Sequence, residues 1–190
     1  MKTYTKKARK GRLTLKNMVL SAMMAAVLCV LAPLAIPVPA AATQITLATF
    51  AVYLSAASLT TFQSVSSVFI YILLGAVGLP VFAGFSGGVG AIAGPTGGYI
   101  IGYLFCAAAA GLIINRFTRR FFMYPVALII GTFLCYTCGT IWFVIMTGNG
   151  LAAALVMCVL PFIPADIVKI IVAAAAGFRQ RGLLSINHIN

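Results

Sequence analysis

Long uncharged runs dominate the pattern of hydrophobic and polar positions along this chain. No Lys, Arg, Asp or Glu occurs between residues 17 and 115, and none occurs between residues 121 and 165. A helix that crosses a bilayer needs about 20 predominantly apolar residues, so these runs predict several crossings. The pattern indicates an all-α, multi-pass membrane protein in which residues 1–190 form a single integral membrane domain.

Prolines, glycines and polar residues divide these runs into six predicted transmembrane helices. The first covers about residues 15–36. The next apolar stretch, residues 45–79, would be about 53 Å long as one helix, whereas the hydrocarbon core is about 30 Å thick. It is therefore predicted to break at the polar patch that starts with Thr60, Thr61 and Gln63. The remaining transmembrane helices are predicted at about 98–114, 122–146 and 164–178, with an apolar segment at 151–160 that is too short to cross.

The basic residues form three clusters, in residues 1–16, 116–120 and 179–190, and they give the chain a formal net charge of +12. Basic clusters that flank transmembrane helices mark the cytoplasmic side. Four and then two helices separate the clusters, and both numbers are even, so both termini are predicted to be cytoplasmic. The N-terminal segment 1–16 is expected to attract anionic lipid. Nucleic-acid binding is not expected, because no basic face with interleaved aromatic residues occurs.

The N-terminus allows a second interpretation. A basic head, an apolar run and the three alanines at residues 40–42 resemble a cleavable signal peptide. The apolar run is longer than a usual signal core, which favours a retained transmembrane helix. The mass of the purified protein would decide between the two.

Residues 78–102, between the third and fourth predicted helices, are rich in glycine and carry no charge. Glycine lets the backbone approach a ligand closely, and irregular backbone at membrane depth persists only where it is buried in protein or lines a cavity. This glycine-rich segment is therefore predicted to lie outside and to form one wall of a binding site, with its aromatic residues against the apolar part of a ligand. The candidate binding residues in it are Phe82, Phe85, Ser86, Gly87, Gly94, Thr96 and Tyr99.

Two charged residues, Asp166 and Lys169, lie within the last predicted transmembrane helix, and Asp166 is the only acid in the chain. Their spacing of three places them on one helix face. Counted inward from Arg179 at about 1.5 Å per residue, Lys169 lies about 15 Å deep and Asp166 about 20 Å deep. Ionisable residues at such depth are costly and are functional by default. We expect Asp166 to accept hydrogen bonds from ligand N–H groups and Lys169 to donate to a carbonyl or carboxylate; a purely structural ion pair is the alternative.

Four motifs in this order resemble the BioY family, the biotin-binding substrate components (S components) of energy-coupling factor (ECF) transporters. They are Gly78-Leu-Pro-Val-Phe-Ala-Gly84, Ser86-Gly-Gly88, Gly94-Pro-Thr-Gly-Gly-Tyr99 and Pro161-Phe-Ile-Pro-Ala-Asp166-Ile-Val-Lys169. The resemblance covers about residues 18–178. Departures from the family pattern occur at Ala48, where Gln is frequent, at residues 60–63, which replace a basic Gly-Pro turn, and at Phe85, where Gly is frequent.

The resemblance implies a six-helix S-component fold in a bacterial cytoplasmic membrane, with a biotin site near the outer face and no cofactor. It implies that Asp166 and Lys169 bind the polar groups of biotin, with the ureido ring as the natural partner. It further implies an ECF transmembrane coupling subunit and ATPase subunits as partners. The small residues Ala22 and Ala26 resemble the surface by which such components dock on the coupling subunit.

An enzymatic function is not expected. Gly84-Phe-Ser86-Gly-Gly88 matches G-x-S-x-G in letters, but a nucleophilic serine needs a histidine base, and the only histidine, His188, lies in the predicted cytoplasmic tail. No G-x-x-x-x-G-K-[ST] motif for binding ATP phosphates occurs. If uptake is driven by ATP, the ATPase is therefore a separate chain.

Two other transport functions stay open. The chain could be an S component for a different vitamin, with the same fold and another ligand. It could also be a self-sufficient transporter with Asp166 as its proton site. The neighbouring ammonium of Lys169 and the lack of a visible inverted repeat argue against proton coupling.

Overall fold

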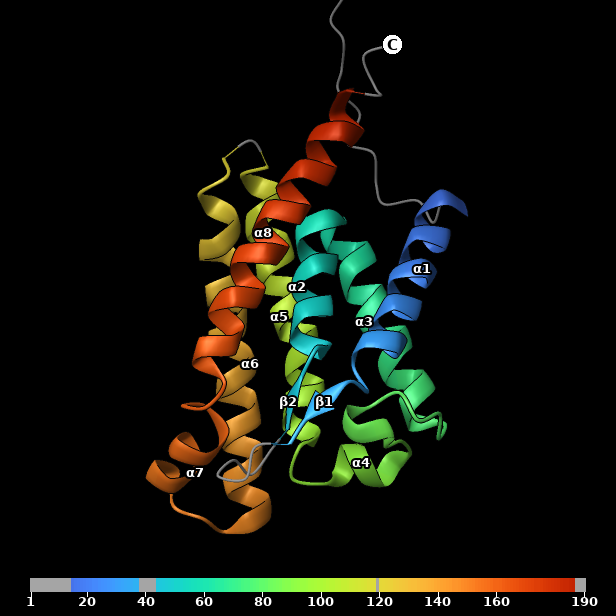
Figure 1. Cartoon of the computed structure of the whole chain (residues 1–190). Helices are drawn as coiled ribbons and strands as arrows, with labels where there is room; N and C mark the ends of the chain where they lie inside the picture. Colours follow the sequence, from blue (N-terminus) through green and yellow to red (C-terminus); the bar gives the residue numbers. More distant parts are fainter. Residues whose placement is uncertain (1–14, 38–43, 119, 187–190) are drawn as a thin grey trace, which may run out of the picture.

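The computed structural model describes residues 15–37, 44–118 and 120–186, which are mostly helical. Six of the helices lie side by side in one bundle (Figure 1): α1 Leu15–Leu31, α2 Ala48–Ser58, α3 Thr61–Ala76, α5 Gly97–Arg116, α6 Met123–Thr147 and α8 Ile163–Ile186. The shorter elements are the antiparallel strands β1 Ala35–Ile36 and β2 Ile45–Thr46, the 3-10 helix Ala83–Phe85, α4 Val89–Ala93 and α7 Leu151–Cys158. The basic residues at 2–12, Arg119, the alanines at 40–42 and His188 lie outside the described residues.

Two of the described helices, α5 and α6, are individually long and apolar enough to cross a membrane. α7 and residues Ile163–Arg181 of α8 form a pair bent by 53° that together meets the same criterion. α1, α2 and α3 are apolar but shorter. The outer faces of the bundle carry exposed large apolar side chains, such as Phe133, Ile145 and Val168. The chain is a multi-pass membrane protein with two to three clear transmembrane helices, and the count of six stays a prediction.

The predicted break after α2 is confirmed, and a capping box fixes it. The Gln63 N–H donates to the Thr60 hydroxyl at 3.4 Å, and the Thr60 N–H donates to Gln63 Oε1 at 3.0 Å. These two bonds satisfy N–H groups that a helix start otherwise leaves without partners. The polar patch therefore ends one helix at Ser58 and starts the next at Thr61.

The first helix is shorter than predicted. It ends at Leu31 instead of residue 36, and Ala35 and Ile36 pair with Thr46 and Ile45 as strands. Two prolines explain the difference: Pro33 has no N–H to continue the helix, and Pro37 favours an extended conformation at Ile36. The last helix is longer than predicted, because it continues past Phe178 to Ile186.

α2 occupies the centre of the bundle, where it packs against α1, α3, α5 and α8. Most of its residues are buried, and many of them are small (Ala48, Ala51, Ser55, Ala56, Ala57 and Ser58). β1, β2, α4 and α7 lie together at one end of the bundle (Figure 1). The start of α1, the α5–α6 connection and the end of α8 lie at the opposite end. The site described next lies among α2, α5, α6, α8 and the glycine-rich segment.

Candidate functional site

A cavity of about 420 Å³ lies among α2, α5, α6 and α8 and is bordered by β2 and the glycine-rich segment. Its size falls within the roughly 300–1,000 Å³ range that is typical of small-molecule sites. The wall is largely apolar and aromatic, with a few polar groups. The lining residues on these elements include Thr46, Thr49, Phe82, Tyr99, Ile100, Tyr103, Tyr136, Phe162, Asp166 and Lys169.

The ion pair predicted from the sequence lies on this wall. The Lys169 ammonium is 2.8 Å from Asp166 Oδ1, and Asp166 is only 4% exposed. Asp166 lies in the first turn of α8, where the helix dipole stabilises a negative charge. The sequence places it there because Pro164 is tolerated at a helix start and not in its interior.

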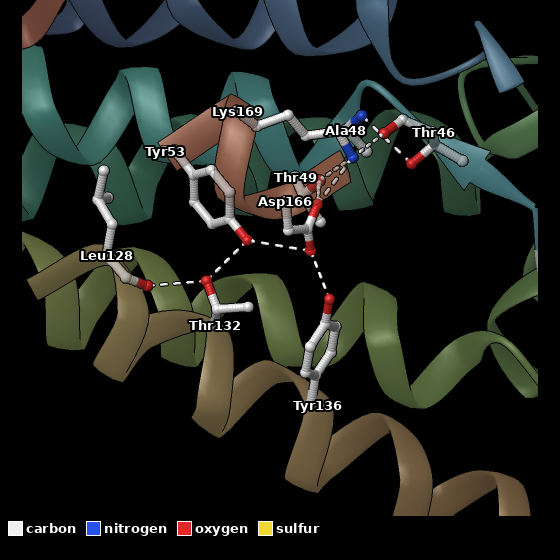
Figure 2. A network of polar contacts seen from close by, with 9 residues as sticks. All are labelled: Thr46, Ala48, Thr49, Tyr53, Leu128, Thr132, Tyr136, Asp166 and Lys169. Atoms are coloured by element: carbon white, nitrogen blue, oxygen red, sulfur yellow. Dashed lines mark hydrogen bonds and ion pairs between the residues drawn. The ribbon is translucent and has the colours of Figure 1, made fainter. Parts of the chain in front are cut away.

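All three N–H donors of the Lys169 ammonium are used within the protein. They reach Asp166 Oδ1 at 2.8 Å, the Thr49 hydroxyl at 2.9 Å and the Thr46 carbonyl at 2.9 Å (Figure 2). An ammonium has three donors and no acceptor. Lys169 thus ties the start of α8 to β2 and to the first turn of α2.

The Asp166 carboxylate is equally well satisfied. Its Oδ1 also accepts from the Thr49 hydroxyl at 3.2 Å, and its Oδ2 accepts from the hydroxyls of Tyr136 at 2.6 Å and Tyr53 at 3.4 Å. The Thr132 hydroxyl lies 2.7 Å from the Tyr53 hydroxyl and extends the network to α6 (Figure 2). A carboxylate has about four lone-pair sites, so the four donors fill it.

Glycines set the positions of two aromatic residues that line the cavity. Phe82 packs on Gly75 of α3, where a Cβ atom would lie 2.0 Å from its ring. Tyr99 packs on Gly139 of α6, where a Cβ atom would lie 2.3 Å from its ring. The Tyr99 hydroxyl also lies 3.4 Å from the Cys158 carbonyl oxygen, to which it donates. The rings therefore have little freedom to leave the wall.

The structure brings most of the predicted site residues together. Phe82, Ser86, Thr96, Tyr99, Asp166 and Lys169 all line the cavity. Phe85, Gly87 and Gly94 are not among its lining residues. Phe85 is 66% exposed, Gly87 faces the Leu79 carbonyl, and the Gly94 carbonyl accepts a hydrogen bond from Trp142 Nε1 at 3.0 Å.

Sequence reasoning missed the hydroxyl groups that surround Asp166. Thr49 and Tyr53 are four residues apart on α2, and Thr132 and Tyr136 are four residues apart on α6. Residues at this spacing share a helix face. Two such pairs of hydroxyl residues in otherwise apolar helices were the signal that could have found them.

Comparison with known proteins identifies relatives of the whole chain and a similar fold. The family model described as the BioY family matches residues 4–185, which confirms the resemblance noted from the motifs. "Biotin transporter BioY2" of Lactococcus lactis subsp. cremoris is 30% identical over 176 residues, which are 93% of this chain and 94% of that protein. "Biotin transporter BioY" of Thermotoga maritima is 34% identical over 148 residues, which are 78% of this chain and 86% of that protein. A solved structure, the S-component for biotin from an ECF-type ABC transporter, matches with a TM-score of 0.82 and 26% identity, over 88% of this chain and 92% of that one.

Proposed function

The chain belongs to the BioY family, and from that membership we propose that it captures biotin in the cavity among α2, α5, α6 and α8 and serves its uptake. The observation that supports this most directly is the buried Asp166–Lys169 pair on the wall of an apolar cavity. Apolar residues would stabilise the bundle as well as a buried ion pair does. The pair is therefore better explained by a polar ligand than by stability.

In this proposal the ureido ring of biotin binds at the Asp166 carboxylate. The ring carries two N–H donors and one carbonyl acceptor. Because the carboxylate is already filled, ligand N–H groups replace protein hydroxyl donors, and the displaced donors need a new acceptor. The ureido carbonyl provides that acceptor, so the exchange leaves no buried group unpaired. Tyr136, at 2.6 Å from Oδ2 and on the cavity wall, is well placed to make it.

The apolar part of biotin then contacts the aromatic and aliphatic wall. Phe82, Ile100 and Phe162 are buried lining residues, and Tyr99 is fixed against Gly139. Burial of apolar ligand surface contributes about 25 cal/mol per Å². This wall provides affinity, whereas the network around Asp166 provides orientation.

We further propose that the chain works as the substrate-specific component of an ATP-driven ECF transporter. The ATPase subunits and the transmembrane coupling subunit are separate chains. Ala22 and Ala26, exposed on α1, form the proposed docking surface for the coupling subunit. In this arrangement six helices cross the membrane, both termini are cytoplasmic, and the N-terminal basic segment contacts anionic lipid.

A binding screen of the purified protein against water-soluble vitamins tests the proposed ligand. Calorimetry in detergent should give tight binding of biotin and no comparable binding of the others. Tight binding of a different vitamin would contradict the proposed ligand, and so would the absence of binding to every vitamin tested. Uptake into proteoliposomes tests the partner proposal: transport by the lone chain that collapses with the proton gradient would favour a self-sufficient transporter instead.

A further inference from the structure

We infer that the carboxylate of bound biotin has no positively charged partner among the described residues of the cavity wall, so that ligands whose acid group is masked as an amide or ester bind almost as well. The inference rests on the proposed function, because it takes the ureido ring to lie at Asp166. It concerns the opposite end of the ligand. It extends the substrate class from biotin to neutral derivatives of its side-chain acid.

The described wall of the cavity carries few charged groups. Among the described residues that line the cavity, Lys169 is the one cation and Asp166 is the one anion. The ammonium of Lys169 already donates to Asp166, Thr49 and the Thr46 carbonyl. A second carboxylate at Lys169 would have to displace one of these acceptors and would also face the charge of Asp166. The cavity therefore offers no cation for the acid group.

The polar lining residues differ in how far they are exposed. Buried polar groups surround Asp166, whereas the exposed polar lining residues are Gln44, Ser86 and Thr96, all of them neutral. They lie next to β2, after the 3-10 helix and at the start of α5. An ionised carboxylate without a partner is costly to bury, so it stays at this exposed mouth, where water solvates it. With the ureido ring at Asp166, the side chain of biotin extends in this direction.

The start of α5 adds a small preference for the acid. Thr96 precedes the first residue of this 20-residue helix, and a helix start carries a partial positive charge. At an exposed position this effect is modest and screened by salt. It predicts an affinity for the acid at most about fivefold higher than for the amide, whereas a buried ion pair would predict a loss of more than about 100-fold on amidation.

Competition binding with biotin, biotinamide and biotin methyl ester tests the inference on the full chain in detergent. Both neutral ligands should bind within tenfold of biotin. If biotin binds tightly and either neutral ligand is weaker by more than tenfold, the inference is overturned while the proposed function stands. If biotin itself does not bind, the proposed function fails and this inference fails with it.

Charge changes at the mouth locate the acid group independently. Gln44→Lys should raise the ratio of biotin affinity to biotinamide affinity by about two- to fivefold, and Gln44→Glu should lower it similarly, since exposed charges interact only this strongly. The ratio cancels any change that a substitution at this lining residue makes to both ligands alike. Gln180→Lys, the same change at an exposed position near the far end of α8, should leave the ratio unchanged. An unchanged ratio in both Gln44 variants would overturn the inference.

Discussion

The hydroxyl of Tyr136 on α6 lies 2.6 Å from Asp166 Oδ2 on α8, and it is the shortest of the four hydrogen bonds that the carboxylate accepts. The bond joins two helices across the wall of the cavity. It also holds the carboxylate in one orientation, with Oδ1 toward Lys169. The geometry of the ion pair therefore depends on a residue that carries no charge.

We predict that Tyr136→Phe weakens biotin binding by about tenfold or more. In the proposed complex this hydroxyl donates to the ureido carbonyl, and a buried acceptor that loses its donor costs roughly 1–3 kcal/mol. Calorimetry in detergent measures the effect. Tyr124→Phe is the matched control, because the Tyr124 hydroxyl donates to the Thr118 carbonyl at the opposite end of α6. Equal affinities in the two variants would contradict the assigned role.

Asp166→Asn should weaken biotin binding by roughly 2–4 kcal/mol. The amide keeps the size of the side chain but removes the negative charge that faces Lys169 at 2.8 Å. It also places N–H donors where Tyr53 and Tyr136 now donate. Wild-type affinity of a folded variant in the same calorimetric assay would show that Asp166 does not contact the ligand.

Thr49 bridges the two charges, and we predict that its hydroxyl is needed for the network. It accepts from Lys169 at 2.9 Å and donates to Asp166 at 3.2 Å. Thr49→Val keeps the shape and leaves one N–H of the ammonium unpaired, which should cost about 1–3 kcal/mol. The expected result is a lower melting temperature and about tenfold weaker biotin binding. Thr49→Ser keeps the hydroxyl and should restore both values, and equal losses in the two variants would point to packing instead.

Local sequence signals predicted the helices closely where strong boundary residues occur. α5 and α6 each begin and end within two residues of the predicted positions. The polar patch that starts with Thr60 marked the break between α2 and α3, which the structure shows to be fixed by a capping box. The strands were not predicted, because Ala35 pairs with Thr46 across a connection whose geometry no local pattern reports.

The site could be predicted only in part for the same reason. A charged residue within an apolar run is easily recognised in a sequence, so Asp166 and Lys169 were found. Two hydroxyl partners of Asp166 lie far away in sequence: Thr49 is separated from it by 117 positions and Tyr53 by 113. Each is a common polar residue of its helix, and only packing of α2 against α8 gives it a role. Glycine content marked the segment at 78–102, but it did not distinguish residues that face the cavity from those, such as Gly87, that face other backbone.

Within the glycine-rich segment, we predict a sharp difference between two glycines. A Cβ atom on Gly97 would lie 1.6 Å from the Ile92 carbonyl oxygen, whereas nothing lies within 4 Å of one on Gly90. Backbone cannot move aside as a side chain can, so Gly97→Ala must shift the connection between α4 and α5. It should lower the melting temperature and weaken biotin binding, because Thr96 and Tyr99 move with it. Gly90→Ala is the control and should leave both values unchanged; an equal response of the two variants would contradict this account.

Arg181 should stabilise the bundle without affecting biotin affinity. Its guanidinium donates to Asn115 Oδ1 at 2.6 Å and to the carbonyls of Ala56, at 3.2 Å, and Leu59 at the end of α2. The last carbonyls of a helix lack partners within the helix, and a cation there also interacts favourably with the dipole. Arg181→Gln should therefore cost about 1–3 kcal/mol and lower the melting temperature by several degrees, as measured by thermal unfolding in detergent. The biotin affinity of the folded protein should stay within a few-fold, since Asp166 lies near the other end of α8.

Arg179→Gln, at an exposed position, should change neither value. If Arg181→Gln weakened binding strongly without lowering the melting temperature, Arg181 would act on the site and not on the stability of the bundle.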